Sequence, residues 1–412
     1  MEKRISVRKN TLYNTAGSFF YLFCQWLLTL LVVRLSGYEA AGDFSLAMAN
    51  TNVFFTLATF GLQHFVISDR QGQFSPDVYL TTRVLTCGAA SVLCLAATLP
   101  GGYTGRQTAC ILLYMLYKAG EALTDMFQAF EYRAERMDYA FVSFVLRGLG
   151  SVLCFSLTLR FTGDVALAIG ALALVTCAIA LCWDGGICRR LTGFRLRFRL
   201  PQTAKLLGIT WPLMANSFLT AAIVSVPRST LERLLGNETL GIYASVATPA
   251  VIVQSAALCL YAPAIVSLTA AWQEGDRAAW RKGQARVWLL LAGLFCLAFA
   301  AGGLLGRWGL TLLFGESIAP HAWQLVPVLA GTMLIAVCYF LSSLLTITRN
   351  LRMILAANAA AALLMLAVRG PMIRDLGMNG VSWTVIAAMG FNALIMAGEL
   401  AWTCRRRFAA NP

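Results

Sequence analysis

Four polar side chains interrupt an otherwise apolar stretch at residues 107–130. They are Lys118, Glu121, Asp125 and Gln128, and the steps between them are three, four and three residues. In an α-helix those steps bring all four side chains onto one face. Charged groups are costly in hydrocarbon, so we expect this face to contact protein or water rather than lipid. Its mixture of a cation, two carboxylates and an amide can bind an anion, bind a coupling cation, or form ion pairs.

Arg147 lies in the next apolar stretch, residues 140–159, about seven residues from its start. At the rise of an α-helix that is a depth of roughly 10 Å, which would allow Arg147 to pair with Asp125 or Glu121. Two interpretations remain open. The charges form a structural ion pair between two helices, or they line a cavity that binds an anionic headgroup or a coupling cation.

The elements that carry these residues are membrane spans. The chain has 412 residues, of which 58% are hydrophobic and 13% charged, and its mean hydropathy is +0.69. Apolar stretches of about 20 residues are long enough to cross the hydrocarbon core as helices. We count twelve, which predicts an all-α integral membrane protein; they lie near residues 11–33, 43–67, 80–99, 107–130, 140–159, 165–183, 206–227, 241–268, 286–305, 321–347, 353–368 and 380–403.

A repeated motif, R-L-x-G-x-E-x-x-G-x-aromatic, divides the chain into two halves. One copy runs from Arg34 to Phe44 and the other from Arg233 to Tyr243, close to half the chain length further on. Each copy follows the first span of a group of six. The pattern predicts two parallel six-helix bundles related by a pseudo-twofold axis along the membrane normal. We expect an N-terminal bundle at 1–190, a basic cytoplasmic linker at 191–204 and a C-terminal bundle at 205–412. The motif itself most simply forms a tight turn at Gly37 and Gly236, each followed by a helix start.

The net charge of +14 is a topology signal. With the N-terminus inside, 23 of the 33 Lys and Arg residues fall on the inner side of the twelve spans and 8 on the outer side. This bias predicts that both termini are cytoplasmic. No compact basic domain exists, which argues against a nucleic-acid partner. The chain has only two His residues and twelve scattered Cys residues, so we expect no metal site.

Several segments resemble bacterial polysaccharide flippases of the Wzx type, members of the multidrug/oligosaccharidyl-lipid/polysaccharide exporter superfamily. The resemblance is strongest in the first 150 residues and is specific to the superfamily, not to a substrate. The segments that carry it are Asn10 to Gly17, Arg34-Leu-Ser-Gly, Gly42-Asp-Phe-Ser-Leu-Ala, Lys118-Ala-Gly-Glu-Ala-Leu-Thr-Asp125, Arg133-Ala-Glu-Arg-Met-Asp138, Leu146-Arg-Gly148, Val226-Pro-Arg228 and Leu240-Gly-Ile-Tyr243.

The resemblance implies a function. Such a protein moves a polyprenyl-diphosphate-linked oligosaccharide across the bacterial cytoplasmic membrane by alternating access of a cavity between two bundles. It is not an enzyme, it needs no cofactor beyond a coupling proton or Na⁺, and its partners would be membrane lipids, a glycan polymerase and glycosyltransferases. Lys118 and Arg147 would bind the diphosphate, with Arg228 as an outer contact. Glu121, Asp125 and Gln128 would tune those charges or bind the coupling ion. Many members have more cavity cations, and here only Lys118, Arg147 and Arg228 qualify.

Three alternatives remain. A cation-coupled multidrug antiporter of the same superfamily would need an acidic cavity, and the mixed stripe leaves this open. A membrane enzyme such as a polymerase or ligase should have a long outer loop with catalytic side chains, which the sequence lacks. A non-transporting component of glycan assembly is the third alternative.

Overall fold

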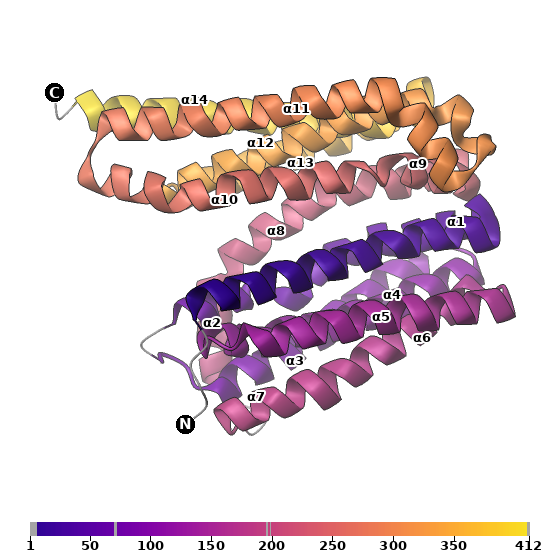
Figure 1. Cartoon of the computed structure of the whole chain (residues 1–412), viewed down its shortest axis with the longest axis horizontal. Coiled ribbons are helices and arrows are strands. Elements are labelled where there is room, and N and C mark those ends of the chain that lie inside the picture. Colours follow the sequence, from indigo (N-terminus) through magenta and orange to yellow (C-terminus); the bar gives the residue numbers. More distant parts are fainter. Residues whose placement is uncertain (1–5, 70–71, 195–196, 198, 410–412) are drawn as a thin grey trace. The chain divides into compact units, whose positions relative to one another are not determined.

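The computed structural model describes residues 6–69, 72–194, 197 and 199–409, and the described residues are helical apart from turns and short loops (Figure 1). The sequence explains this, because long apolar segments in lipid must satisfy their backbone groups within helices. The predicted all-α fold class is confirmed. Four basic residues used in the topology argument, Lys3, Arg4, Arg70 and Arg195, lie outside the described residues.

The contacts divide the chain into two compact units, Met1–Ala221 and Ala222–Pro412. In the first unit, α1 packs against α3, α4 and α5, and α6 packs against α4 and α5. Its elements are α1 (Val7–Thr59), α2 (Leu62–Ser68), α3 (Pro76–Thr98), η1 (Leu99–Gly101), α4 (Gly105–Arg133), α5 (Met137–Thr162), α6 (Val165–Ile179), the π-helical turn η2 (Ala180–Asp184), α7 (Gly185–Thr192) and the first part of α8 (Leu200–Leu235). The bundle boundary predicted within residues 191–204 stays a prediction.

In the second unit, α12 packs against α10 and α14, and α13 packs against α14. Its core contains Trp272, Trp280 and Phe340, all buried. The elements are the end of α8, α9 (Asn237–Ala247), α10 (Ala250–Glu274), α11 (Arg277–Phe314), the 3₁₀ segment η3 (Glu316–Gln324), α12 (Leu325–Ile347), α13 (Leu351–Leu376) and α14 (Asn379–Ala409).

Ten helical segments of the described residues are long and apolar enough to cross a membrane. The first of them, Arg8–Ile67, covers two of the expected spans, which Gly37 separates by a kink within α1. Helix α4 is not among the ten, because its polar stripe lowers its hydropathy. With these two adjustments the helices correspond to the twelve predicted spans, and the chain is a multi-pass integral membrane protein.

The two motif glycines adopt the same unusual backbone conformation. Gly37 has φ 82° and ψ −176°, and Gly236 has φ 88° and ψ 168°. This region is essentially accessible to glycine alone, because a Cβ atom makes it strained. The expected tight turn is therefore confirmed at both copies. The motif's aromatic residue packs inward in each unit: Phe44 meets Tyr114 and Phe155 edge-on, and the Tyr243 hydroxyl lies 3.3 Å from that of Ser382.

Replacing either motif glycine with alanine should destabilise the protein by about 1–3 kcal/mol, the typical strain of such a backbone conformation. A Cβ at either position would meet no other atom within 4 Å, so the loss would come from the backbone alone. The shift in melting temperature of the detergent-purified Gly37→Ala and Gly236→Ala variants measures it. Gly303→Ala, at an exposed helical position with equal space, is the control and should cause no loss. Equal melting temperatures for all variants would contradict the assignment.

Candidate functional site

A cavity of about 430 Å³ in the first unit collects the polar stripe of α4. Lys118, Glu121, Asp125 and Gln128 all line it, and so does Arg147 of α5. The other side is formed by α1 and α2. The remaining lining residues are largely aromatic or apolar: Tyr21, Leu22, Gln25, Phe44, Met48, Phe55, Gln63, Tyr114, Tyr117, Tyr132 and Phe144.

Glu121 is the centre of the charge network. Its carboxylate lies 2.6 Å from Lys118 Nζ and 3.9 Å from Arg147 Nη1. It also accepts a hydrogen bond from the Tyr21 hydroxyl. The Tyr117 hydroxyl lies 3.0 Å from that of Tyr21, so one acidic side chain links three helices, α1, α4 and α5.

Three hydrogen-bond donors on the cavity wall lack a protein acceptor among the described residues. They are Arg147 Nε, Gln128 Nε2 and Gln25 Nε2. The side chain of Arg147 is only 4% exposed, and its one described carboxylate contact is the loose one to Glu121. A buried donor without an acceptor is costly. The cavity is therefore chemically suited to a ligand rich in oxygen acceptors, such as a phosphate or a sugar.

Aromatic rings hold both cations in position. Lys118 Nζ lies 4.9 Å from the centre of the Phe55 ring and 5.2 Å from that of Tyr117. The Arg147 guanidinium lies 4.6 Å from the centre of the Tyr21 ring. Cation–π contacts of this kind stabilise a desolvated cation without supplying a counter-charge. The counter-charge described for both cations is therefore the single carboxylate of Glu121.

The turn between α4 and α5 is fixed by a residue of α1. Asn10 donates a 2.6 Å hydrogen bond to the Glu135 carbonyl and accepts a 3.2 Å bond from the Met137 backbone amide. Further along α1, Gly17 lies so close to α5 that a Cβ would be 2.9 Å from Phe144. These contacts set the register of α1 against α5, and hence of Tyr21 against Arg147.

Asp125 pairs with a residue that the sequence did not single out. Its carboxylate accepts a 2.8 Å hydrogen bond from Arg83 Nη2 of α3, and the Arg83 side chain is completely buried. Arg83 also donates to the Ala58 carbonyl at 2.9 Å. Arg83 is one of the 23 basic residues counted on the inner side, but its side chain is buried within the first unit. Arg147, which was expected to pair with Asp125 or Glu121, lies near Glu121. Only the position of Arg83 inside an apolar stretch could have signalled a buried role.

Arg228 lies outside this cavity. It belongs to the part of α8 in the second unit and is half-buried. The structure thus brings together five of the six residues selected from the sequence, and Arg228 is not one of them.

Comparison with known proteins identifies a family and a fold. The sequence model of a family described as "Polysaccharide biosynthesis protein" matches residues 7–267. The capsular polysaccharide biosynthesis protein CapF of Staphylococcus aureus is 22% identical over 247 residues, which are 59% of this chain and 61% of CapF. The match therefore spans less than two thirds of that curated relative.

Solved transporters share the fold over nearly the whole chain. The lipid II flippase MurJ, in an inward closed conformation, aligns with a TM-score of 0.73 at 11% identity, covering 97% of this chain and 91% of MurJ. An inward-facing multidrug resistance transporter of the MATE family, in the MOP superfamily, aligns with a TM-score of 0.70 at 13% identity, covering 94% and 95%. A MOP superfamily transporter from Pyrococcus furiosus aligns with a TM-score of 0.65 at 14% identity, covering 99% and 98%.

Proposed function

Because the chain belongs to the polysaccharide biosynthesis protein family, we propose that it is a flippase for a polyprenyl-diphosphate-linked oligosaccharide. The observation that carries the proposal is the cavity with unsatisfied donors at Arg147, Gln128 and Gln25. Transport of the lipid-linked glycan by alternating access also agrees with the fold that the chain shares with MurJ and the MATE transporters.

The diphosphate would replace the Glu121 carboxylate as the partner of Lys118 and Arg147. In the structure Glu121 is the shared carboxylate of Lys118 and Arg147. A diphosphate offers more oxygen acceptors than one carboxylate, and a guanidinium can bind two of them at once. The headgroup would therefore draw the two cations away from Glu121, while Gln25 and Gln128 donate to the sugar or phosphate oxygens. The polyprenyl tail remains in the bilayer, where its transfer costs little.

The coupling ion is assigned to the same network. When the diphosphate takes over Lys118 and Arg147, Glu121 loses its two cationic partners and becomes the natural binding group for a proton or Na⁺. Asp125 keeps Arg83 as its counter-charge and would tune the cavity. Arg228 would contact the substrate from the second unit.

A multidrug antiporter is the second candidate, and the fold shared with MATE transporters favours it. Such a protein would bind organic cations, which need free carboxylates. Here Glu121 and Asp125 each have a cationic partner, and the unsatisfied groups are donors. The chemistry of the wall therefore favours an acceptor-rich anion.

The proposal extends to topology and partners. Both termini would face the cytoplasm of a bacterial cell. Substrate would be loaded from that side of the membrane, where the glycosyltransferases act. A glycan polymerase would receive the product on the other side.

Binding to the purified protein distinguishes the two candidates. We expect saturable binding of a polyprenyl-diphosphate oligosaccharide, reversed by inorganic diphosphate, and no saturable binding of an organic cation such as ethidium. The Arg147→Ala variant, matched for folding by its melting temperature, should lose the first interaction. Saturable ethidium binding without binding of the diphosphate lipid would favour the antiporter and contradict the proposal.

A further inference from the structure

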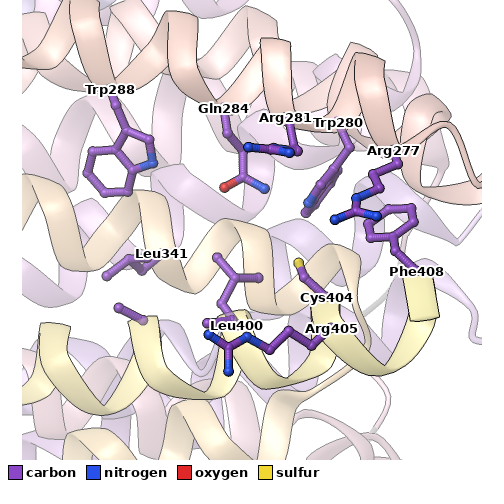
Figure 2. A pocket seen from close by; sticks show the side chains of 12 residues that line it. Arg277, Trp280, Arg281, Gln284, Trp288, Leu341, Leu400, Cys404, Arg405 and Phe408 are labelled. Atoms are coloured by element: carbon purple, nitrogen blue, oxygen red, sulfur yellow. The ribbon is translucent and has the colours of Figure 1, made fainter.

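A second cavity, of about 550 Å³, lies wholly within the second unit between α11, α12 and α14. Figure 2 shows the side chains of α11 facing those of α14 across it. The α11 residues are Arg277, Trp280, Arg281, Gln284 and Trp288, and those of α14 include Leu400, Cys404, Arg405 and Phe408. None of them belongs to the cavity of the first unit.

The cavity has a cationic rim and an apolar interior. Arg277, Arg281 and Arg405 are exposed, and no ion pair to any of them occurs among the described residues. They lie beyond the apolar spans predicted at 286–305 and 380–403, where the hydrocarbon ends. Trp288, Leu341 and Leu400 line the part that continues into those spans. A ligand that fills the whole cavity must therefore join an anionic group to an apolar chain.

Trp280 supplies an unsatisfied donor at the junction of the two regions. Its side chain is 1% exposed, and its indole Nε1–H is buried without a well-placed acceptor among the described residues. Its polar neighbour is the Cys404 thiol, which is only a weak acceptor. The Trp272 ring, 4.9 Å away between ring centres, holds Trp280 in place. A buried tryptophan usually finds a partner for its N–H, so this one points to a missing acceptor.

The neighbouring acids do not neutralise the rim. Asp276 caps α11 by accepting the Ala279 backbone amide at 2.9 Å. Glu399 accepts hydrogen bonds from Asn350 and Thr403. A nearby arginine, Arg407, already has partners in the protein. It donates a 2.7 Å hydrogen bond to the Trp272 carbonyl and lies over the Trp272 indole ring. Among the described residues that line this cavity, Arg277, Arg281 and Arg405 thus keep their charge for a ligand.

We propose that this cavity binds an anionic phospholipid. The phosphate would lie among Arg277, Arg281 and Arg405 and accept from Trp280 Nε1, with one acyl chain along Trp288, Leu341 and Leu400. Basic pockets between transmembrane helices commonly bind such headgroups, and the volume suits a headgroup with part of a chain. The site is separate from the diphosphate site proposed for the first unit, and it stands whether or not that proposal holds.

Native mass spectrometry of the detergent-purified full chain tests the site. The probe is dioleoyl phosphatidylglycerol, with dioleoyl phosphatidylcholine as its zwitterionic match. In the triple variant Arg277→Gln, Arg281→Gln, Arg405→Gln, phosphatidylglycerol affinity should fall about a hundredfold. The matched control is Lys282→Gln, Arg286→Gln, Arg406→Gln, which removes the same charge from the same helices at positions that do not line the cavity. It should keep the wild-type affinity.

Trp280→Phe provides a second readout, because it keeps an aromatic ring and removes only the N–H donor. We expect roughly a fivefold loss of affinity for phosphatidylglycerol. Three results would overturn the proposal. These are equal losses in the triple variant and its control, equal affinity for the two lipids, or displacement of phosphatidylglycerol by micromolar polyprenyl diphosphate, which would assign the cavity to the transported lipid.

Discussion

Replacing Arg147 with alanine should lower export of the glycan by roughly thirtyfold or more, with normal amounts of protein in the membrane. The truncation removes the guanidinium that we propose binds the diphosphate. Loss of one member of a desolvated charge pair costs about 2–5 kcal/mol. The fold should survive, because Glu121 keeps Lys118 at 2.6 Å and the hydrogen bond from Tyr21. Surface glycan per unit of membrane protein is the measurement.

Two further variants separate this role from a general effect of charge. Arg147→Lys retains the charge without the two-pronged geometry and should give intermediate export. Arg160→Ala removes an exposed arginine from the same helix and should leave export unchanged. Wild-type export by Arg147→Ala would remove Arg147 from the site.

Breaking the buried pair of Arg83 and Asp125 should produce the second large effect, this time on stability. Asp125→Leu leaves a fully buried guanidinium without its counter-charge, and such a change typically costs 3–5 kcal/mol. Arg83→Met should be similarly harmful, because Asp125 loses its cationic partner. The Ala58 carbonyl also loses one of its two described side-chain donors and keeps the Thr86 hydroxyl. The melting temperatures of the purified variants measure both losses.

The double variant Arg83→Met, Asp125→Leu should recover most of that loss, because it removes both charges and leaves a volume filled by apolar side chains. Strictly additive losses in the double variant would mean that the two residues do not interact. In that case the 2.8 Å contact would not contribute to the fold.

Periodicity explains why one side of the site could be predicted. Steps of three and four residues fix which side chains share a face of α4, so the shared position of Lys118, Glu121, Asp125 and Gln128 on one cavity wall follows from the sequence. Hydropathy similarly predicted the membrane spans, and the two glycines of the repeated motif predicted the turns. These features depend on neighbours along one helix.

Pairing between helices could not be obtained in this way. Asp125 and Arg83 are 42 residues apart and meet only because α3 and α4 pack together. Glu121 and Tyr21 are 100 residues apart, on α4 and α1. Which cation meets which carboxylate depends on the rotation of each helix about its axis, and close approaches such as that of Gly17 to Phe144 set that rotation.

Translocation in proteoliposomes tests the central claim most directly. Purified protein is reconstituted with a fluorescent polyprenyl-diphosphate oligosaccharide in both leaflets, and a membrane-impermeant reductant bleaches the label that it can reach. We predict that bleaching proceeds beyond the outer leaflet, towards completion, with the wild-type protein and Arg160→Ala, and stops at about half with Arg147→Ala. Bleaching that stops at half with the wild-type protein, under the same conditions, would contradict the assignment of this chain as a flippase.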